Sequence, residues 1–229
     1  MEAPDALTNW DLDPSAWRIL PDSGNSALVG NSGLNKPAVV LGKASPPPAW
    51  ADPNNRNLYM SLNIQLDNQL SVGRVIFRYS DSGYYVMELG SGLIKLSRGA
   101  SNKIDRPTEK QLQGGIYPNA PIRSGTFYQW NIWSDDNRVY VYQDNHLVLQ
   151  AKDAGTPLPG GSILFQTLSP QLAYSVRYDN LKVQRPVPAS QHFEGSGWPS
   201  TWTRTDQTTA IIGDDNQGNH FIEQSSGNV

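Results

Sequence analysis

The sequence predicts an all-β protein, a jelly-roll sandwich of two antiparallel sheets, on the strength of three observations. Short runs that alternate apolar and polar residues recur along most of the 229-residue chain, as expected of strands with one buried face. No window longer than about ten residues repeats apolar residues at helical spacing without a Gly or Pro. The 20 glycines and 17 prolines supply the tight turns that antiparallel strands need.

The predicted strands follow one another at short intervals, and turn signals separate them. Ser82-Gly83, Asp144-Asn145 and Pro159-Gly160 are typical of such turns. The stretch from Gly99 to Ser124 is polar and Pro-containing, so we expect a long loop there over one end or edge of the sheets. In chain order, the strands are expected at residues 26–30, 37–42, 57–66, 72–80, 84–89, 92–97, 126–134, 138–143, 146–150, 162–167 and 173–183.

A self-match between the two ends of the chain divides it into domains. PSAWRILPDSGNSALVGNSGLN (Pro14–Asn35) and PSTWTRTDQTTAIIGDDNQGNH (Pro199–His220) share Pro-Ser-x-Trp and then a short apolar run that ends in Gly. The copies are a whole domain length apart, far more than the period of a solenoid repeat. We therefore expect a sandwich domain at 1–185, a Pro-rich linker at 186–191 and a partial second repeat at 192–229, either truncated or packed as added strands.

The composition excludes several classes of partner. The formal net charge is −3 and no Lys/Arg cluster occurs, which argues against nucleic acid and anionic membranes. No apolar run reaches the roughly 20 residues that cross a bilayer, and no cysteine is present for disulfides, thiolate chemistry or zinc. Seven Trp and ten Tyr against five Phe favour aromatic rings at wet surfaces, although the cores of large β domains also use them.

The order of the segments resembles the concanavalin A-like lectin/glucanase superfamily, in particular its LamG-like jelly-roll modules. The resemblance lies in GRVIFRYSDSGYYVMELGSGLIKLSR, FYQWNIWSDDNRVYVYQDNHLVLQAKD and LPGGSILFQTLSPQLAYSVRYDNLKV, followed by a restart at HFEGSGWPSTW, and covers about residues 5–185. It implies a module of a bacterial secreted or surface multidomain protein, located outside the cell or on its surface, although MEAPDALTNW has no signal-peptide pattern. The superfamily contains hydrolases, lyases, lectins and adhesive modules, so the resemblance implies the fold more closely than the function.

Strand alternation sorts the side chains of the central strands into two sets, because neighbours on a strand face opposite ways. The apolar set is expected to pack between the sheets. If the strands of the other set share one curved sheet, that set would line a concave glycan-binding face, with aromatic rings stacked on sugars and polar groups bonded to hydroxyls. Its members are Arg78, Glu88, Asn131, Trp133, Tyr140 and Tyr142. The alternative is a solvated sheet face under the 99–124 loop, with Arg78 and Glu88 as a cross-strand ion pair.

Catalysis is not expected. Retaining glycosidases need two carboxylates roughly 5 Å apart, and the glucanase relatives implied by the resemblance carry Glu-x-Asp-x-x-Glu on one strand. The matching strand here, YYVMELGSG, offers Glu88 alone. The lyase relatives pair a Gln-x-His with a Tyr, but His146 in DNHLVL has no Gln two residues before it. No Gly-x-Ser-x-Gly nucleophile elbow occurs either.

The resemblance also implies a structural Ca²⁺ as cofactor, held where the final strand meets the N-terminal one. Asp179 in YDN is the candidate from the final strand, and Asp11 and Asp13 in WDLD would supply further oxygens if the termini pair. Calcium takes six to eight oxygen ligands, so backbone carbonyls would complete the set. The alternative is that Asp179 and Asn180 form a turn or bulge.

Three functions from different classes stay open. The first is a non-catalytic carbohydrate-binding or adhesion module of a larger extracellular protein, with a polysaccharide or other glycan as partner, and it requires an exposed aromatic row. The second is a structural or protein–protein interaction spacer in a surface protein or filament, with a neighbouring protein domain as partner. It requires an unpaired edge strand and an ordered tail beyond Gln191. The third and least favoured, a glycoside hydrolase or polysaccharide lyase, requires convergent carboxylates in a cleft.

Overall fold

The computed structural model describes residues 10–11, 13–22, 25–31, 38–40, 51–54, 56–116, 122–168, 175–184, 210–214 and 220–224. The chain separates into two compact units, Met1–Arg185 and Pro186–Val229. Among the described residues, no helix is long and apolar enough to cross a membrane.

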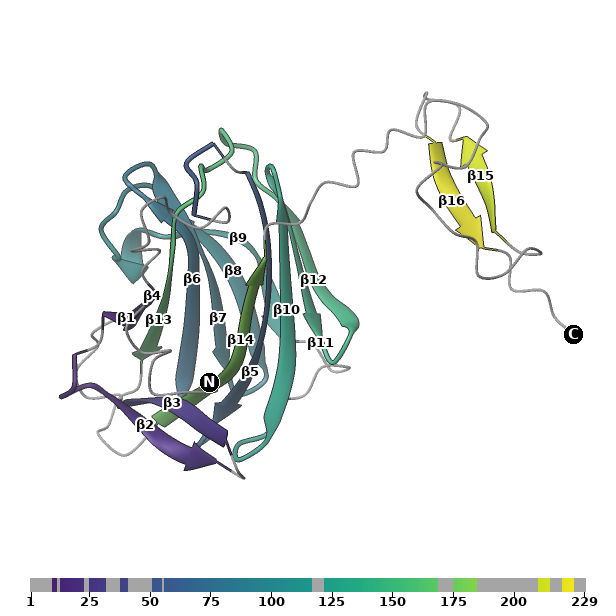
Figure 1. The fold of residues 1–229 in the computed structure, drawn as a ribbon. Helices are drawn as coiled ribbons and strands as arrows, with labels where there is room; N and C mark the ends of the chain where they lie inside the picture. Colours follow the sequence, from purple (N-terminus) through teal and green to yellow (C-terminus); the bar gives the residue numbers. More distant parts are fainter. Residues whose placement is uncertain are drawn as a thin grey trace, which may run out of the picture. The chain divides into compact units, whose positions relative to one another are not determined.

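The described part of the first unit is a sandwich of two seven-stranded antiparallel sheets (Figure 1). Sheet A consists, in spatial order, of β1 (Trp10–Asp11), β4 (Ala38–Val40), β13 (Ser162–Leu168), β6 (Val72–Ser80), β7 (Gly83–Gly90), β8 (Leu93–Gly99) and β9 (Lys110–Ile116). Sheet B consists of β12 (His146–Lys152), β11 (Arg138–Gln143), β10 (Phe127–Asp135), β5 (Asn57–Leu66), β14 (Ser175–Gln184), β3 (Asn25–Asn31) and β2 (Trp17–Asp22). The predicted all-β jelly-roll sandwich is confirmed.

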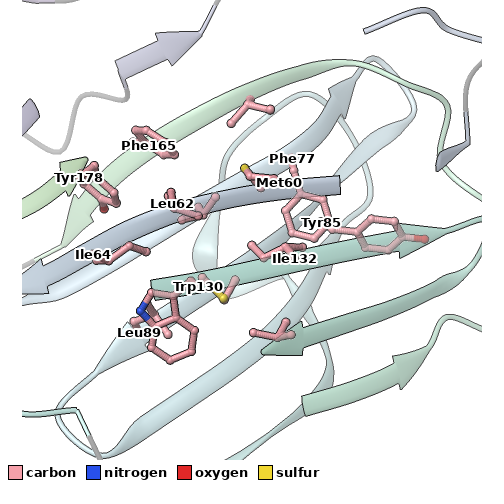
Figure 2. Packing of buried hydrophobic residues seen from close by; sticks show 14 of the residues in the cluster. Met60, Leu62, Ile64, Phe77, Tyr85, Leu89, Trp130, Ile132, Phe165 and Tyr178 are labelled. Atoms are coloured by element: carbon pink, nitrogen blue, oxygen red, sulfur yellow. The ribbon is translucent and has the colours of Figure 1, made fainter. Parts of the chain in front are cut away.

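The core lies between the two sheets, where the apolar side chains of alternating positions meet (Figure 2). Leu62 and Ile132 of sheet B and Phe77 of sheet A are almost fully buried. Phe165 of β13 stacks on Tyr178 of β14 across the sandwich, with ring centroids 4.4 Å apart and planes 4° from parallel. Burying one such side chain stabilises the folded state by roughly 1.5–3 kcal/mol. Each alternating strand therefore strongly favours turning its apolar face towards the core.

Local pattern predicts the central strands well and the edge strands poorly. The bounds of β5, β6 and β11 coincide with the predicted strands 57–66, 72–80 and 138–143. The stretch 99–124 was expected to be a loop, but it contains β9 and a 3-10 helix, η2 (Arg106–Thr108). This expectation is wrong because β9 is an edge strand whose polar sequence, KQLQGGI, carries no buried alternation.

The second unit contains a hairpin of β15 (Ala210–Asp214) and β16 (His220–Gln224). β15 includes the apolar run of the second sequence copy, as β3 includes that of the first. The predicted linker at 186–191 lies outside the described residues. The assignment of 192–229 to a partial second repeat stays a prediction.

Candidate functional site

The six predicted binding residues lie on two different sheets. Arg78 of β6 and Glu88 of β7 belong to sheet A. The other four lie on β10 and β11 of sheet B: Asn131, Trp133, Tyr140 and Tyr142. The expectation that all six share one concave face is therefore wrong. Alternation along a strand fixes which way a side chain points, but it does not say which of two sheets the strand joins.

Three aromatic side chains form a continuous row across the outer face of sheet B. Tyr59 of β5 lies directly opposite Trp133 of β10, and Trp133 lies directly opposite Tyr140 of β11. The ring centroids of Trp133 and Tyr140 are 5.5 Å apart, and the ring planes are tilted by 36°. Trp133 is 42% exposed, and both tyrosines are partly exposed. We call Tyr59, Trp133 and Tyr140 the aromatic row.

The rings of the aromatic row point outward because their neighbours in sequence point into the core. Leu58, Ile132 and Val139, each next in sequence to a residue of the aromatic row, are buried between the sheets. Because successive side chains on a strand point to opposite faces, the row residues must face solvent. An exposed indole between two phenols presents flat apolar surface edged by polar groups, which suits stacking on a ring-shaped ligand.

Asn131 lies beside the aromatic row, on the same face of β10 as Trp133, and bonds to Tyr59. It is 6% exposed, its Oδ1 accepts a hydrogen bond from the Tyr59 hydroxyl at 3.0 Å, and its Nδ2 donates to Asn145 Oδ1 at 3.3 Å. Tyr142 lies opposite Asn131 on β11 and is partly exposed. The four predicted residues of sheet B thus share one surface, on which Asn131 positions Tyr59 and the aromatic rings face outward.

Arg78 does not point in the direction that strand alternation predicts. A β-bulge interrupts the β6–β7 register at this position, and Arg78 has a positive φ of 54°. The side chain crosses to sheet B, where Nη1 donates to Ser134 Oγ at 2.9 Å and to the Asp136 carbonyl at 2.7 Å. The expected ion pair of Arg78 with Glu88 is therefore wrong, because the bulge turns Arg78 into the space between the sheets.

The surroundings of Arg78 are those of a structural group. The guanidinium lies 5.7 Å from the ring centroid of Tyr85, and burial lowers its pKa. The Tyr85 hydroxyl donates to Asp153 Oδ2 at 2.9 Å; burial and then this bond raise the pKa of Tyr85 to about 12. Burial alone would raise the pKa of Asp153, but hydrogen bonds from the Gly155 N–H, Arg98 and Tyr85 lower it overall. This buried network ties sheet A to sheet B.

Glu88 belongs to a charged row on the outer face of sheet A. Gln166, Arg74, Glu88 and Lys95 lie in register across β13, β6, β7 and β8, and we call them the ionic row. Arg74 Nε lies 3.4 Å from Glu88 Oε2, and Lys95 Nζ lies 3.7 Å from Glu88 Oε1. Both Arg74 and Glu88 are 1% exposed. The Glu88 carboxylate is therefore buried and paired with the positive charges of Arg74 and Lys95.

The connection between β8 and β9 covers the ionic row. Arg106 of η2 donates from Nε and Nη2 to the two oxygens of Glu88 at 2.9 and 2.6 Å, and these bonds raise the pKa of Arg106. Glu109 Oε1 accepts hydrogen bonds from Arg74 and from the Tyr84 hydroxyl. Burial, and then the bond to Glu109, raise the pKa of Tyr84 to about 12. The segment after β8 is thus fastened to the sheet by charge-assisted hydrogen bonds.

The predicted calcium ligands lie on different sheets. Asp11 is in β1, which pairs with β4 in sheet A, whereas Asp179 is in β14 between β5 and β3 in sheet B. The final strand does pair with an N-terminal strand, β3, but Asp11 is not in that strand. Asp13 Oδ1 accepts from the Ser15 N–H at 2.9 Å, and Asp179 Oδ1 accepts from the Asn180 N–H at 2.7 Å, both turn-type bonds.

In the described part of the chain, no group of three His, Cys, Asp or Glu side chains could hold a metal ion. Calcium bound largely through carbonyl oxygens is a different kind of site, and it stays a prediction.

Tyr59 of the aromatic row and Arg74 of the ionic row are among the residues of these surfaces that the sequence prediction lacks. Tyr59 carries a usable signal, because it alternates with the apolar Leu58 and Met60 in NLYMSLNIQL. Trp133, the residue beside Tyr59 in the sheet, is far away in the sequence, so no local sequence pattern predicts that β5 pairs with β10. Arg74 stands before the continuous apolar run Val75-Ile76-Phe77, and its pairing with Glu88 depends on the β6–β7 register.

No protein-family model matches this sequence, and no curated protein matches it. Solved structures are similar in fold. A protein of unknown function with a galectin-like fold from Bacillus subtilis is 12% identical with a TM-score of 0.59, covering 80% of this chain and 92% of that one. The carbohydrate binding module CBM66 from Bacillus subtilis is 13% identical with a TM-score of 0.54, covering 77% of this chain and 95% of that one.

A candidate glycosyl hydrolase from Parabacteroides distasonis is 12% identical with a TM-score of 0.51, covering 79% of this chain and 95% of that one. Such low identities show the fold alone, because one fold hosts many unrelated functions. The chain is therefore similar in architecture to galectin-like and CBM66-type jelly-roll sandwiches, as expected of the concanavalin A-like fold.

Proposed function

We propose that the first unit is a non-catalytic carbohydrate-binding module that holds a glycan on the aromatic row. The observation that carries the proposal is the position of Trp133, which is 42% exposed and flanked in register by Tyr59 and Tyr140. The C–H groups on one face of a pyranose ring make it apolar, and this face stacks favourably on an indole or phenol. Glycan binding would account for these exposed rings, which are not part of the buried core.

The polar groups around the aromatic row are suited to hydrogen bonding with sugar hydroxyls. Gln184 lies opposite Tyr59 on β14, and Gln150 lies opposite Tyr140 on β12. Both amides are exposed, and each offers donors and an acceptor to sugar hydroxyls. That a structurally similar protein is named as a carbohydrate binding module supports the proposal through the shared architecture.

The carboxylates of sheet A favour binding over catalysis. Glu88 and the side chain of Glu109 are each 1% exposed. Arg74 lies close to both, and Arg106 also binds Glu88. A general acid or nucleophile must reach the scissile bond. Glu88 is instead covered by the β8–β9 connection, and Glu109, which belongs to that connection, is turned onto Arg74. We therefore do not propose glycan cleavage.

A protein-interaction role is the second candidate, and the position of β9 favours it. β9 ends sheet A and pairs with β8 on one side, so its other edge could accept a strand of a neighbouring domain. In either role, we propose that the chain works as a module of a larger protein outside the cell or on its surface. Analytical ultracentrifugation separates the two candidates, because strand addition requires a protein partner or a second copy.

Affinity electrophoresis of the full chain tests the proposed function. Native gels cast with hydroxyethyl cellulose, xylan, galactomannan or another soluble polysaccharide should retard the protein in at least one case. Trp133→Ala should abolish the retardation, while Leu70→Ala, which truncates a 52% exposed side chain outside the row, should not. Free migration of the unaltered protein in every gel would contradict the proposal.

A further inference from the structure

We infer that the aromatic row binds an internal stretch of a neutral, linear polysaccharide, with the glycan chain lying across the strands of sheet B. This inference rests on the proposed function and adds the class of ligand and its direction. Three features of the outer face carry it: the length of the row, the exposed side chains at its ends and its lack of charge.

The row is longer than one sugar. Neighbouring strands are about 4.8 Å apart, so Tyr59 and Tyr140 stand about 10 Å apart with Trp133 between them. A pyranose unit in an extended glycan is about as long as one strand spacing. Consecutive units can therefore meet consecutive rings when the glycan runs perpendicular to the strands.

Among the described residues, exposed side chains flank the row at both ends. All three rings stand on strands of the sheet, and the next residues in register on either side, Gln184 and Gln150, are exposed amides. A site that recognises the terminus of a glycan must close around the last sugar with bulky or buried groups. Exposed amides at both ends instead let a chain continue past the row in either direction.

The row and its neighbour are almost uncharged. The next line of outward side chains in register contains Lys182, Ser61, Asn131, Tyr142 and Leu147. Of the ten positions in these two lines, Lys182 alone is charged. The line on the other side, Asn57, Asp135, Arg138 and Lys152, contains charges of both signs, with one carboxylate beside two cations. Uronates and sulfated sugars are recognised by concentrated positive charge, which these lines lack, whereas hydroxyls need neutral donors and acceptors.

The row is also held in place before a ligand arrives. The bond from the Tyr59 hydroxyl to Asn131 fixes one end, and the Trp133 and Tyr140 rings contact each other at 5.5 Å between centroids. An array of rings that are already fixed in place loses little conformational entropy on binding. Its affinity should then grow with the number of sugar units that lie on it.

Isothermal titration of the full chain with cello-, xylo- and manno-oligosaccharides, from the monosaccharide to the hexasaccharide, tests the inference. We expect affinity in one series to rise at least about tenfold, or 1.4 kcal/mol, up to about three or four units and then to level off. Tyr59→Ala and Tyr140→Ala should each remove most of this gain, with Leu70→Ala as the matched control. The affinity should change little between low and high salt.

Each other outcome would overturn the inference, and the outcomes are distinguishable. A monosaccharide that binds as tightly as its polymer would indicate a site for a glycan terminus. Tightest binding to polygalacturonate, weakened by salt, would indicate an acidic ligand. A dimer that Trp133→Ala converts to monomer would make the row an interface between two copies. Failure of every oligosaccharide and polysaccharide to bind would contradict the proposed function itself, whereas binding without length dependence contradicts only this inference.

Discussion

The Tyr59 hydroxyl on β5 donates a hydrogen bond to the side-chain amide oxygen Oδ1 of Asn131 on β10, at 3.0 Å and across the strand pair. This bond joins a residue of the aromatic row to a nearly buried amide, which itself bonds to Asn145. It is the contact that orients one end of the proposed binding surface.

Removing either partner of this bond should weaken glycan binding by a similar amount. Asn131→Ala and Tyr59→Phe each break it, and each is expected to cost about 1 kcal/mol of binding free energy because the ring loses its fixed orientation. The double variant should cost little more than either single one, which a double-mutant cycle measures. If the two losses of binding free energy were fully additive, Asn131 would affect glycan binding independently of its bond to Tyr59.

Arg78 should prove structural. Arg78→Ala removes a buried side chain and its bonds to Ser134 and to the Asp136 carbonyl, so we expect a loss of about 2–4 kcal/mol in the free energy of unfolding. Arg177→Ala, which breaks a partly exposed pair with Asp67, should cost less than about 1 kcal/mol. Urea denaturation gives both values. Weaker glycan binding with unchanged stability in Arg78→Ala would instead make Arg78 a ligand contact.

Glu88 should stabilise sheet A without touching the ligand. Glu88→Gln leaves Arg74, Arg106 and Lys95 without their shared carboxylate, and removing one partner from a buried charge cluster typically costs about 3–5 kcal/mol. Asp67→Asn is the matched control at a partly exposed pair. Retardation in polysaccharide gels should be unchanged for any Glu88→Gln protein that remains folded. Lost binding by a folded variant would transfer the binding site to the outer face of sheet A.

Stability should fall at high pH through two of the buried tyrosines, Tyr84 and Tyr85. The pKa of Tyr84 and of Tyr85 is raised to about 12 in the folded protein, against about 10 in an unfolded chain. Between these values the unfolded chain releases protons that the folded protein keeps. The stabilisation present below about pH 10 is therefore lost as the pH rises towards about 12. Melting temperatures across this range should drop steeply, and less steeply in Tyr84→Phe.

Alternation along the chain predicts which side chains are buried but not how the strands are assembled. Strands β5, β6 and β11 and the inward positions of residues such as Ile132 and Val141 follow from local pattern, because one face of each strand meets the core. The separation of β6 and β7 from β10 and β11 into opposite sheets depends on pairing between distant segments. Apolar and polar residues alternate in the same way in strands of either sheet. The predicted site therefore grouped residues of sheet A with residues of sheet B, although they do not share a face of the sandwich.

Arg78 shows a second limit of local pattern. A bulge changes the direction of one side chain without changing the alternation around it, and only the positive φ and the interrupted register reveal it. Trp133 and Tyr140, in contrast, lie in adjacent strands joined by a short turn, so their shared face was predictable from the sequence between Trp130 and Gln143.

The most direct test of the account is a fluorine NMR titration of the full chain labelled with 5-fluorotryptophan. The resonance of Trp133, assigned from a Trp133→Phe sample, should move as the retarding polysaccharide is added, because the ring contacts the sugar. The resonances of Trp17 and Trp130, which are 3% and 1% exposed, should stay in place as internal controls. A glycan that binds while the Trp133 resonance does not move would contradict the assignment of the aromatic row as the binding surface.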